Sequence, residues 1–193
     1  MAELVSKWQA AFWQTLSLLK NAAPLRDAAL AGRLGEWTQT LTGVVVATCE
    51  AIGWQASARW HPLDLLPMPR SEYLALDVMA FPAGGQRWRF PVAVFELENS
   101  RDDNRIAYSL WKVLCVRAAL GVVFCYRRSP AQGASLVRFL QDHVLKAMPL
   151  ADRVALGGET LLVVGSRDES DLFPYGFFRW WRLNTDIGSF EPM

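Results

Sequence analysis

The sequence predicts one α/β domain in which helices flank a mixed central sheet. Three observations predict this class: apolar residues near the N-terminus recur at helical three- and four-residue steps, β-forming runs follow from residue 54, and helix-like and strand-like segments alternate after residue 100. No repeat or linker-like stretch interrupts the 193 residues. We therefore expect a single domain over residues 1–193, with N-terminal helices (1–34), a core (35–126), and a C-terminal helix with strands (127–193).

The first part of the chain is predicted to be helical. Its apolar stripe consists of Leu4, Trp8, Phe12, Leu16 and Leu19. Pro24 should start a second short helix, because proline is favoured at the first helical position. A third helix is expected over residues 35–52 and should end at Gly53, since glycine commonly follows a helix C-terminus.

Strand-forming segments follow these helices. Residues 54–60 alternate large and polar side chains, as a strand does, and residues 73–81 and 88–98 are rich in β-formers. A turn signal, Pro82-Ala83-Gly84-Gly85, separates the last two segments. We expect these two segments to form an antiparallel hairpin.

A helix is then predicted over residues 100–120. Ser100 and Asp103 resemble a capping box at its start, and Gly121 should end it. One face of this helix carries Ile106, Leu110, Val113, Leu114 and Arg117. A buried strand is expected directly afterwards, over residues 122–126.

The C-terminal third should complete the sheet. Residues 136–148 read as an amphipathic helix stopped by Pro149, and residues 160–165 as another short strand. The aromatic tail, residues 173–190, is expected to contain a last strand or hairpin. Basic and aromatic residues are interleaved in residues 177–182. Such a segment can bind single-stranded nucleic acid, but an alternating strand at the edge of the domain produces the same sequence pattern.

Composition excludes several classes of function. The net charge is only +1, so no global field attracts nucleic acid. Three cysteines without a CxxC spacing argue against a disulfide framework and a zinc site, and two histidines give little support to Ser-His-Asp catalysis. No apolar run reaches the roughly 18 residues of a membrane span, and no leader peptide is recognisable. We expect a cytoplasmic protein without a membrane partner.

Three carboxylates occur where strands are usually most apolar. Asp77 interrupts the segment 73–81, whereas Glu96 and Glu98 end the segment 88–98. Because side chains alternate across a strand, Glu96 and Glu98 should share one face. Phe95 and Leu97 should occupy the other face. If residues 85–88 form the hairpin tip, Asp77 lies across from Glu96.

Carboxylates gathered in a partly buried place are costly unless something neutralises them. A divalent cation, Mg²⁺ or alternatively Mn²⁺, does so and can activate water for phosphodiester cleavage. The simpler interpretation has the acids solvated or paired with Arg87, Arg89 or Arg101. Three acids at one end of a hairpin favour a metal site built on Asp77, Glu96 and Glu98.

The pattern Asp77…Glu96-x-Glu98, with a helix before the strands and another after them, resembles the PD-(D/E)XK, or restriction-endonuclease-like, nuclease superfamily. The resemblance covers residues 36–126 and implies an αβββαβ core carrying an N-terminal helical extension. It implies a divalent-metal-dependent nuclease that hydrolyses phosphodiester bonds, with DNA favoured over RNA. Asp77 and Glu96 would be metal ligands, and Leu97 could add its backbone carbonyl.

The chain departs from that family at Glu98, where lysine is usual. Some similar members carry glutamate there, and others move the lysine to the following helix, where this chain has Lys112. On a face with Arg105, Tyr108 and Ser109, Lys112 could hold the attacking water or stabilise the transition-state phosphate. If Lys112 is instead a solvated surface residue, the alternative is an inactive module that binds nucleic acid or a protein partner.

Further candidates surround this set. Glu50, near the end of the third helix, matches an accessory acid of the family, with Glu36 as its competitor and a plain surface role as the alternative. Arg127 and Arg128 directly follow a strand and could contact a phosphate backbone, although basic residues are common there. The nine tryptophans are compatible with a homodimer.

Overall fold

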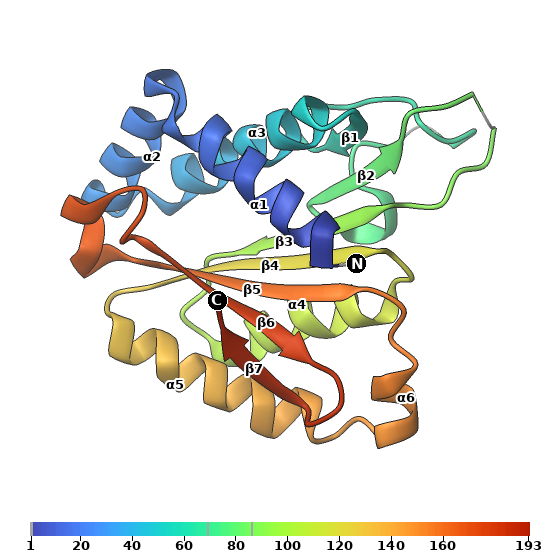
Figure 1. Cartoon of the computed structure of the whole chain (residues 1–193). Coiled ribbons are helices and arrows are strands. Elements are labelled where there is room, and N and C mark those ends of the chain that lie inside the picture. The colour runs from blue at the N-terminus through green and yellow to red at the C-terminus, as the bar shows by residue number, and fades with distance from the viewer. Residues whose placement is uncertain (1, 69, 86) are drawn as a thin grey trace.

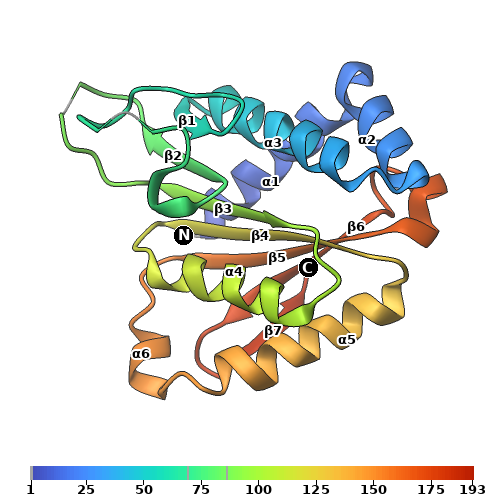
Figure 2. The same ribbon diagram turned by 180° about the vertical axis from the view of Figure 1, so that it is seen from behind.

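The computed structural model describes residues 2–68, 70–85 and 87–193. One seven-stranded mixed sheet runs through the molecule in the order β1-β2-β3-β4-β5-β6-β7. Helices α1, α2 and α3 cover one face of the sheet, and α4 and α5 lie against the other (Figures 1 and 2). No helix in the described ranges has both the length and the apolar character needed to cross a membrane.

The helices are α1 (Ala2–Ser17), α2 (Leu19–Ala31), α3 (Leu34–Ala51), α4 (Asp103–Cys115), α5 (Pro130–Leu140) and α6 (Leu150–Val154), with short turns η1 (Tyr73–Ala75), η2 (Gln141–Leu145) and η3 (Arg167–Leu172). The strands are β1 (Trp54–Ala58), β2 (Val78–Pro82), β3 (Ala93–Glu98), β4 (Leu120–Arg127), β5 (Glu159–Ser166), β6 (Phe178–Asn184) and β7 (Ser189–Pro192). The run α3-β1-β2-β3-α4-β4 has the predicted order αβββαβ.

The sheet is parallel only in its centre. β3, β4 and β5 run in the same direction, whereas β1-β2, β2-β3, β5-β6 and β6-β7 are antiparallel pairs. The carboxyl ends of the three parallel strands therefore meet at one edge. Loops that follow parallel strands commonly form ligand sites at this edge.

The N-terminal helices pack as an aromatic layer on the sheet. Trp8, Phe12 and Leu16 of α1 are fully buried, as their helical spacing predicts. Leu19 is 81% exposed, so the stripe stops one turn early. The prediction that Pro24 starts a helix is wrong: the break falls at Leu18, whose backbone is extended, and Pro24 lies inside α2.

The segment around Asp77 differs from the predicted strand. Residues 73–75 form η1, with left-handed backbone at Leu74 and Ala75, and β2 begins only at Val78. The predicted antiparallel pairing with β3 is confirmed. β3 starts at Ala93, five residues later than expected, and the predicted hairpin tip includes residue 86, which lies outside the described residues.

Helix α4 is capped and ended differently from the prediction. Its N-cap is Asp102, whose carboxylate accepts a hydrogen bond from Asn104 N, and not a Ser100–Asp103 capping box. Gly121 lies inside β4 instead of ending the helix. A Cβ at Gly121 would stand 2.5 Å from Cγ1 of Val113, so glycine lets α4 approach the sheet closely.

Helix α5 begins six residues earlier than predicted. Ser129 caps it by accepting from Gln132 N, and Pro130 occupies its first turn. This start signal was present in the sequence, because serine at the N-cap followed by proline is a favoured combination. The C-terminal hairpin is confirmed as β6 and β7.

Candidate active site

Asp77 lies opposite Glu96, as predicted. The register pairs Val78 with Phe95, and extending it by one residue places Asp77 across from Glu96. Asp77 continues this alignment beyond the strand, because its Oδ2 accepts a hydrogen bond from Leu97 N at 2.7 Å. The Asp77 side chain thus provides a hydrogen bond to β3 just beyond the last backbone pair between β2 and β3.

The alternation of side chains along β3 is also confirmed. Phe95 and Leu97 belong to the core beneath α1–α3, while Val94 packs in the core beneath α4 and α5. Glu96 shares the face of Val94 and is only 3% exposed. Glu98 is half-buried on the same side, and its Oε1 accepts a hydrogen bond from Ser100 N at 2.8 Å.

Lys112 reaches this face from α4. The apolar side of the helix is buried on the sheet, which directs Lys112 toward β3. Its Nζ lies 2.7 Å from Glu96 Oε1 and donates a hydrogen bond to the Ala75 carbonyl at 2.9 Å. Lys112 therefore joins η1, β3 and α4 at one point, and it is not the solvated helix lysine of the alternative interpretation.

Burial dominates the electrostatics of the two central acids. It raises the pKa of Asp77, which the Leu97 N–H and the Lys112 charge lower only in part. It also raises the pKa of Glu96; hydrogen bonding from Lys112 opposes this rise, and the Asp77 charge adds to it. The charged forms of these two neighbouring carboxyl groups would be stabilised by additional positive charge close to them.

A pocket of about 440 Å³ collects these groups. It is lined by Asp77, Glu96, Leu97, Glu98, Asn104, Arg105, Tyr108, Ser109 and Lys112. All four principal candidates from the sequence thus lie in one hollow, together with the three α4 residues expected beside Lys112. We refer to it as the acidic pocket.

The accessory acids are not brought to this pocket. Glu50 is exposed in the last turn of α3, while Thr38, near the start of the same helix, contacts Asn99 just after β3. Twelve residues of helix separate Thr38 from Glu50, a length of about 18 Å. The competitor Glu36 is exposed and paired with Arg33 at 2.8 Å.

The predicted arginine partners of the acids lie elsewhere. Arg89 donates to Gln55 Oε1 at 2.6 Å, and Arg101 lines a second pocket. Arg87 forms no ion pair within the part of the chain that the structure describes. Among the described residues, Lys112 is thus the cation that forms an ion pair in this acidic set, with Glu96.

The structure groups fewer acidic side chains than the predicted metal site on Asp77, Glu96 and Glu98 requires. Across residues 2–68, 70–85 and 87–193, no three His, Cys, Asp or Glu side chains are grouped to hold a metal ion. Asp77 and Glu96 supply carboxylate oxygens, and Oδ1 of Asp77 has no hydrogen bond to the described residues. Mg²⁺ commonly binds one or two carboxylates and completes its shell with water and substrate phosphate.

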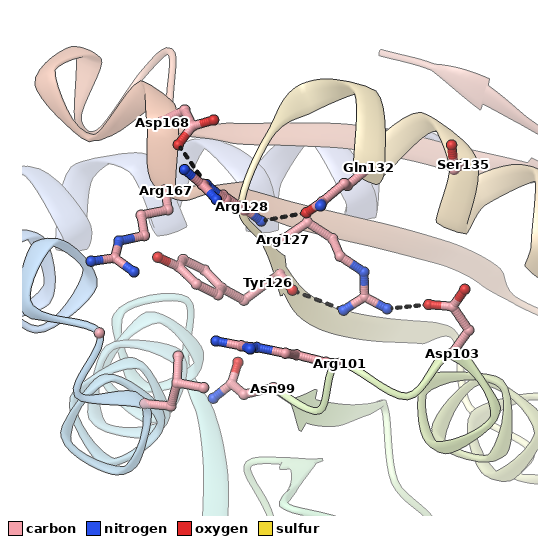
Figure 3. A pocket seen from close by; sticks show the side chains of 12 residues that line it. Asn99, Arg101, Asp103, Tyr126, Arg127, Arg128, Gln132, Ser135, Arg167 and Asp168 are labelled. Atoms are coloured by element: carbon pink, nitrogen blue, oxygen red, sulfur yellow. Dashed lines mark hydrogen bonds and ion pairs between the residues drawn. The ribbon is translucent and has the colours of Figure 1, made fainter.

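A second, larger hollow lies where the parallel strands end (Figure 3). Its volume is about 840 Å³, and four arginines line it: Arg101, Arg127, Arg128 and Arg167. Arg127 and Arg128 were candidates in the sequence. Arg167 was missed, although it directly follows β5 in the same way. We refer to this hollow as the arginine pocket.

No protein-family model matches the chain, and no curated protein matches it. Two solved structures do: E. coli MS115-1 NucC and P. aeruginosa ATCC27853 NucC, each in its cAAA-bound form. In both cases the TM-score is 0.45 and the sequence identity 15%, over 92% of this chain and 83% of the other. Likeness at this distance does not assign the chain to a family.

Proposed function

We propose that this protein is a divalent-metal-dependent nuclease that hydrolyses phosphodiester bonds in nucleic acid. One observation carries the proposal: Asp77, the buried Glu96 and Lys112 converge in one pocket, with Lys112 Nζ 2.7 Å from Glu96. The convergence is that expected from the resemblance to PD-(D/E)XK nucleases, with the lysine moved to the helix after the third strand.

Asp77 and Glu96 would hold the ion, with the Leu97 carbonyl as a further oxygen in the same pocket. Mg²⁺, or Mn²⁺ in its place, would supply an activated water and neutralise charge on the phosphate. Lys112 would stabilise the phosphate oxygens as their negative charge grows. Glu98, which is half-buried, would accept the proton of the attacking water.

The electrostatics of the pocket support metal binding. A metal ion competes with protons for a carboxylate. Its positive charge stabilises the carboxylate most where burial already disfavours the charged form, as at Asp77 and Glu96. Because the pKa values of Asp77 and Glu96 are raised, metal affinity should increase with pH through the acid range. The same pH dependence should appear in the cleavage rate.

The second candidate function is a binding module with an inactive site. Lys112 favours it, because its ammonium already neutralises Glu96 without a metal. Such a module would hold nucleic acid or a protein partner and would cleave nothing. The two functions differ in their response to Mg²⁺.

The decisive experiment compares matched variants in a cleavage assay on DNA and RNA substrates with Mg²⁺ or Mn²⁺. We expect Asp77→Asn and Lys112→Met to reduce the rate by about 10²-fold or more, since each removes a group acting on the transition state. The surface pair Asp142–Lys146, also in contact at 2.6 Å, supplies the controls Asp142→Asn and Lys146→Met, which should cleave normally.

Calorimetric titration with Mn²⁺ gives an independent readout. Wild-type protein should bind the ion, and Asp77→Asn should bind it weakly or not at all. If the wild-type protein binds no Mn²⁺ and cleaves no substrate, the nuclease proposal is overturned and the binding module remains.

A further inference from the structure

The arginine pocket is built from the loops that follow three parallel strands. Asn99 and Arg101 come after β3, Arg127 ends β4, and Arg167 follows β5 (Figure 3). The first turns of α5 contribute Gln132 and Ser135. Residues distant in sequence thus place several guanidinium groups around one hollow.

Two of the four arginines lie beside carboxylates. Arg127 is 8% exposed; it donates to the carbonyls of Ser100 and Tyr126 at 2.9 Å and pairs with Asp103 at 2.5 Å. Arg128 faces Asp168 at 3.8 Å, a loose contact between exposed side chains that contributes little. The two carboxylates of the pocket, Asp103 and Asp168, therefore lie beside Arg127 and Arg128.

The other two arginines form no ion pair with a carboxylate of the described residues. Within the same part of the chain, the Arg167 guanidinium donates only to the Leu30 carbonyl, at 3.0 Å. Arg101 makes no hydrogen bond or ion pair with any residue that the structure describes, although its side chain lines the pocket (Figure 3). With four guanidinium groups and two carboxylates, the lining carries an excess of two positive charges. Planar guanidinium donors suit phosphate oxygens.

An unused acceptor accompanies these donors. Asn99 donates through Nδ2 to Thr38, but its buried Oδ1 has no hydrogen-bond partner among the described residues. A buried acceptor left without a donor is costly, so a ligand with a hydroxyl or amino group would relieve it. Phosphate oxygens alone cannot, because they are acceptors themselves.

From these observations we infer that the arginine pocket binds a nucleotide-type ligand: Arg101 and Arg167 hold its phosphate, and Asn99 accepts from a sugar hydroxyl or a base amino group. A volume of about 840 Å³ is in the usual range for small-molecule sites. The phosphate could belong to a free nucleotide or to one nucleotide of a strand. This site does not depend on the proposed nuclease activity.

The arginine pocket borders the acidic pocket. Asn99, Arg101 and Asp103 line the former, whereas the preceding Glu98 and the following Asn104 line the latter. One short segment between β3 and α4 thus separates the two hollows. A ligand held by Arg101 would lie next to the residues proposed for cleavage.

The test measures binding without divalent metal, so that it is separate from cleavage. The probes are adenosine 5′-monophosphate, inorganic pyrophosphate and a short single-stranded oligodeoxynucleotide, titrated calorimetrically at low salt. We expect saturable binding that Arg101→Ala and Arg167→Ala each weaken by about tenfold or more. Arg117→Ala, an exposed arginine outside both pockets, is the matched control and should bind normally.

The probes also separate the sources of the phosphate. Binding of the monophosphate alone identifies a free nucleotide, and preference for the oligonucleotide identifies a strand. Asn99→Ala should weaken the nucleotide probes and leave pyrophosphate unchanged. If no probe saturates, or if Arg117→Ala loses as much affinity as Arg101→Ala, the inference is overturned, whatever the cleavage assays show.

Discussion

At the scale of single residues, Asp77 and Glu96 occupy places that disfavour a negative charge. Burial is the largest cause of the raised pKa of each, and the Asp77 charge further raises the pKa of Glu96. A structural role alone would be better served by a neutral amide or by an apolar side chain. Carboxyl groups retained in such a place are typical of functional sites.

This cost predicts that Asp77→Asn stabilises the fold at neutral pH. The folded-state pKa of Asp77 is raised above 3.8, so its ionisation lowers the free energy of unfolding as pH rises from 3.8 through the raised value. Below 3.8 the carboxyl group is protonated in both the folded and the unfolded state, and it costs nothing. We expect a Tm increase of about 2–4 °C at pH 7, corresponding to about 1 kcal/mol in a domain of this size. The increase should vanish in acid.

The matched control is Asp142→Asn, because the pKa of Asp142 is shifted in the opposite direction. The Lys146 ammonium lowers the pKa of the exposed Asp142, so Asp142→Asn should not stabilise at neutral pH. Thermal unfolding of both variants from pH 3 to pH 8 provides the measurement. A Tm of Asp77→Asn below that of the wild type at pH 7 would contradict the prediction.

At the scale of elements, α4 determines the chemistry that the acids can have. The helix packs closely on β4 because Gly121 has no side chain, and this closeness lets Lys112 span from β3 to η1. An α4 held further from the sheet would leave Glu96 buried without its cation. The position of one glycine is thus coupled to the ion pair.

We predict that Gly121→Ala destabilises the protein by about 1–3 kcal/mol, because its Cβ would meet Val113 Cγ1 at 2.5 Å. Adding Val113→Ala should relieve part of the clash. Gly35→Ala in α3, where a Cβ meets nothing within 4 Å, is the control and should not destabilise. Urea unfolding measures all three. Equal stability of Gly121→Ala and wild type would refute the coupling.

At the scale of the whole molecule, α1 ties distant strands together. Trp8 is fully buried and its ring contacts Phe95 of β3, Phe124 of β4 and Trp180 of β6. These strands carry the acids at one side and the C-terminal hairpin at the other. The aromatic layer therefore holds the sheet on which both pockets are built.

Removing this contact should cost far more than removing an exposed tryptophan. We expect Trp8→Ala to lower the free energy of unfolding by about 3–5 kcal/mol, since a large side chain is lost from a packed core. Trp88→Ala, whose side chain is 62% exposed, should change it by less than about 0.5 kcal/mol. Comparable losses in the two variants would show that α1 does not stabilise the sheet.

Local chemistry in the sequence determined the order of the core elements and the face of each acid. Alternation along a strand places Glu96 and Glu98 together wherever that strand lies, and the turn signal before β3 implies an antiparallel neighbour for Asp77. Tertiary structure alone decided that Lys112 reaches Glu96, that Glu50 stays at the far end of α3, and that Arg101 and Arg167 share a pocket. These contacts depend on register and helix packing between segments far apart in the chain, and periodicity within one segment carries no information about either.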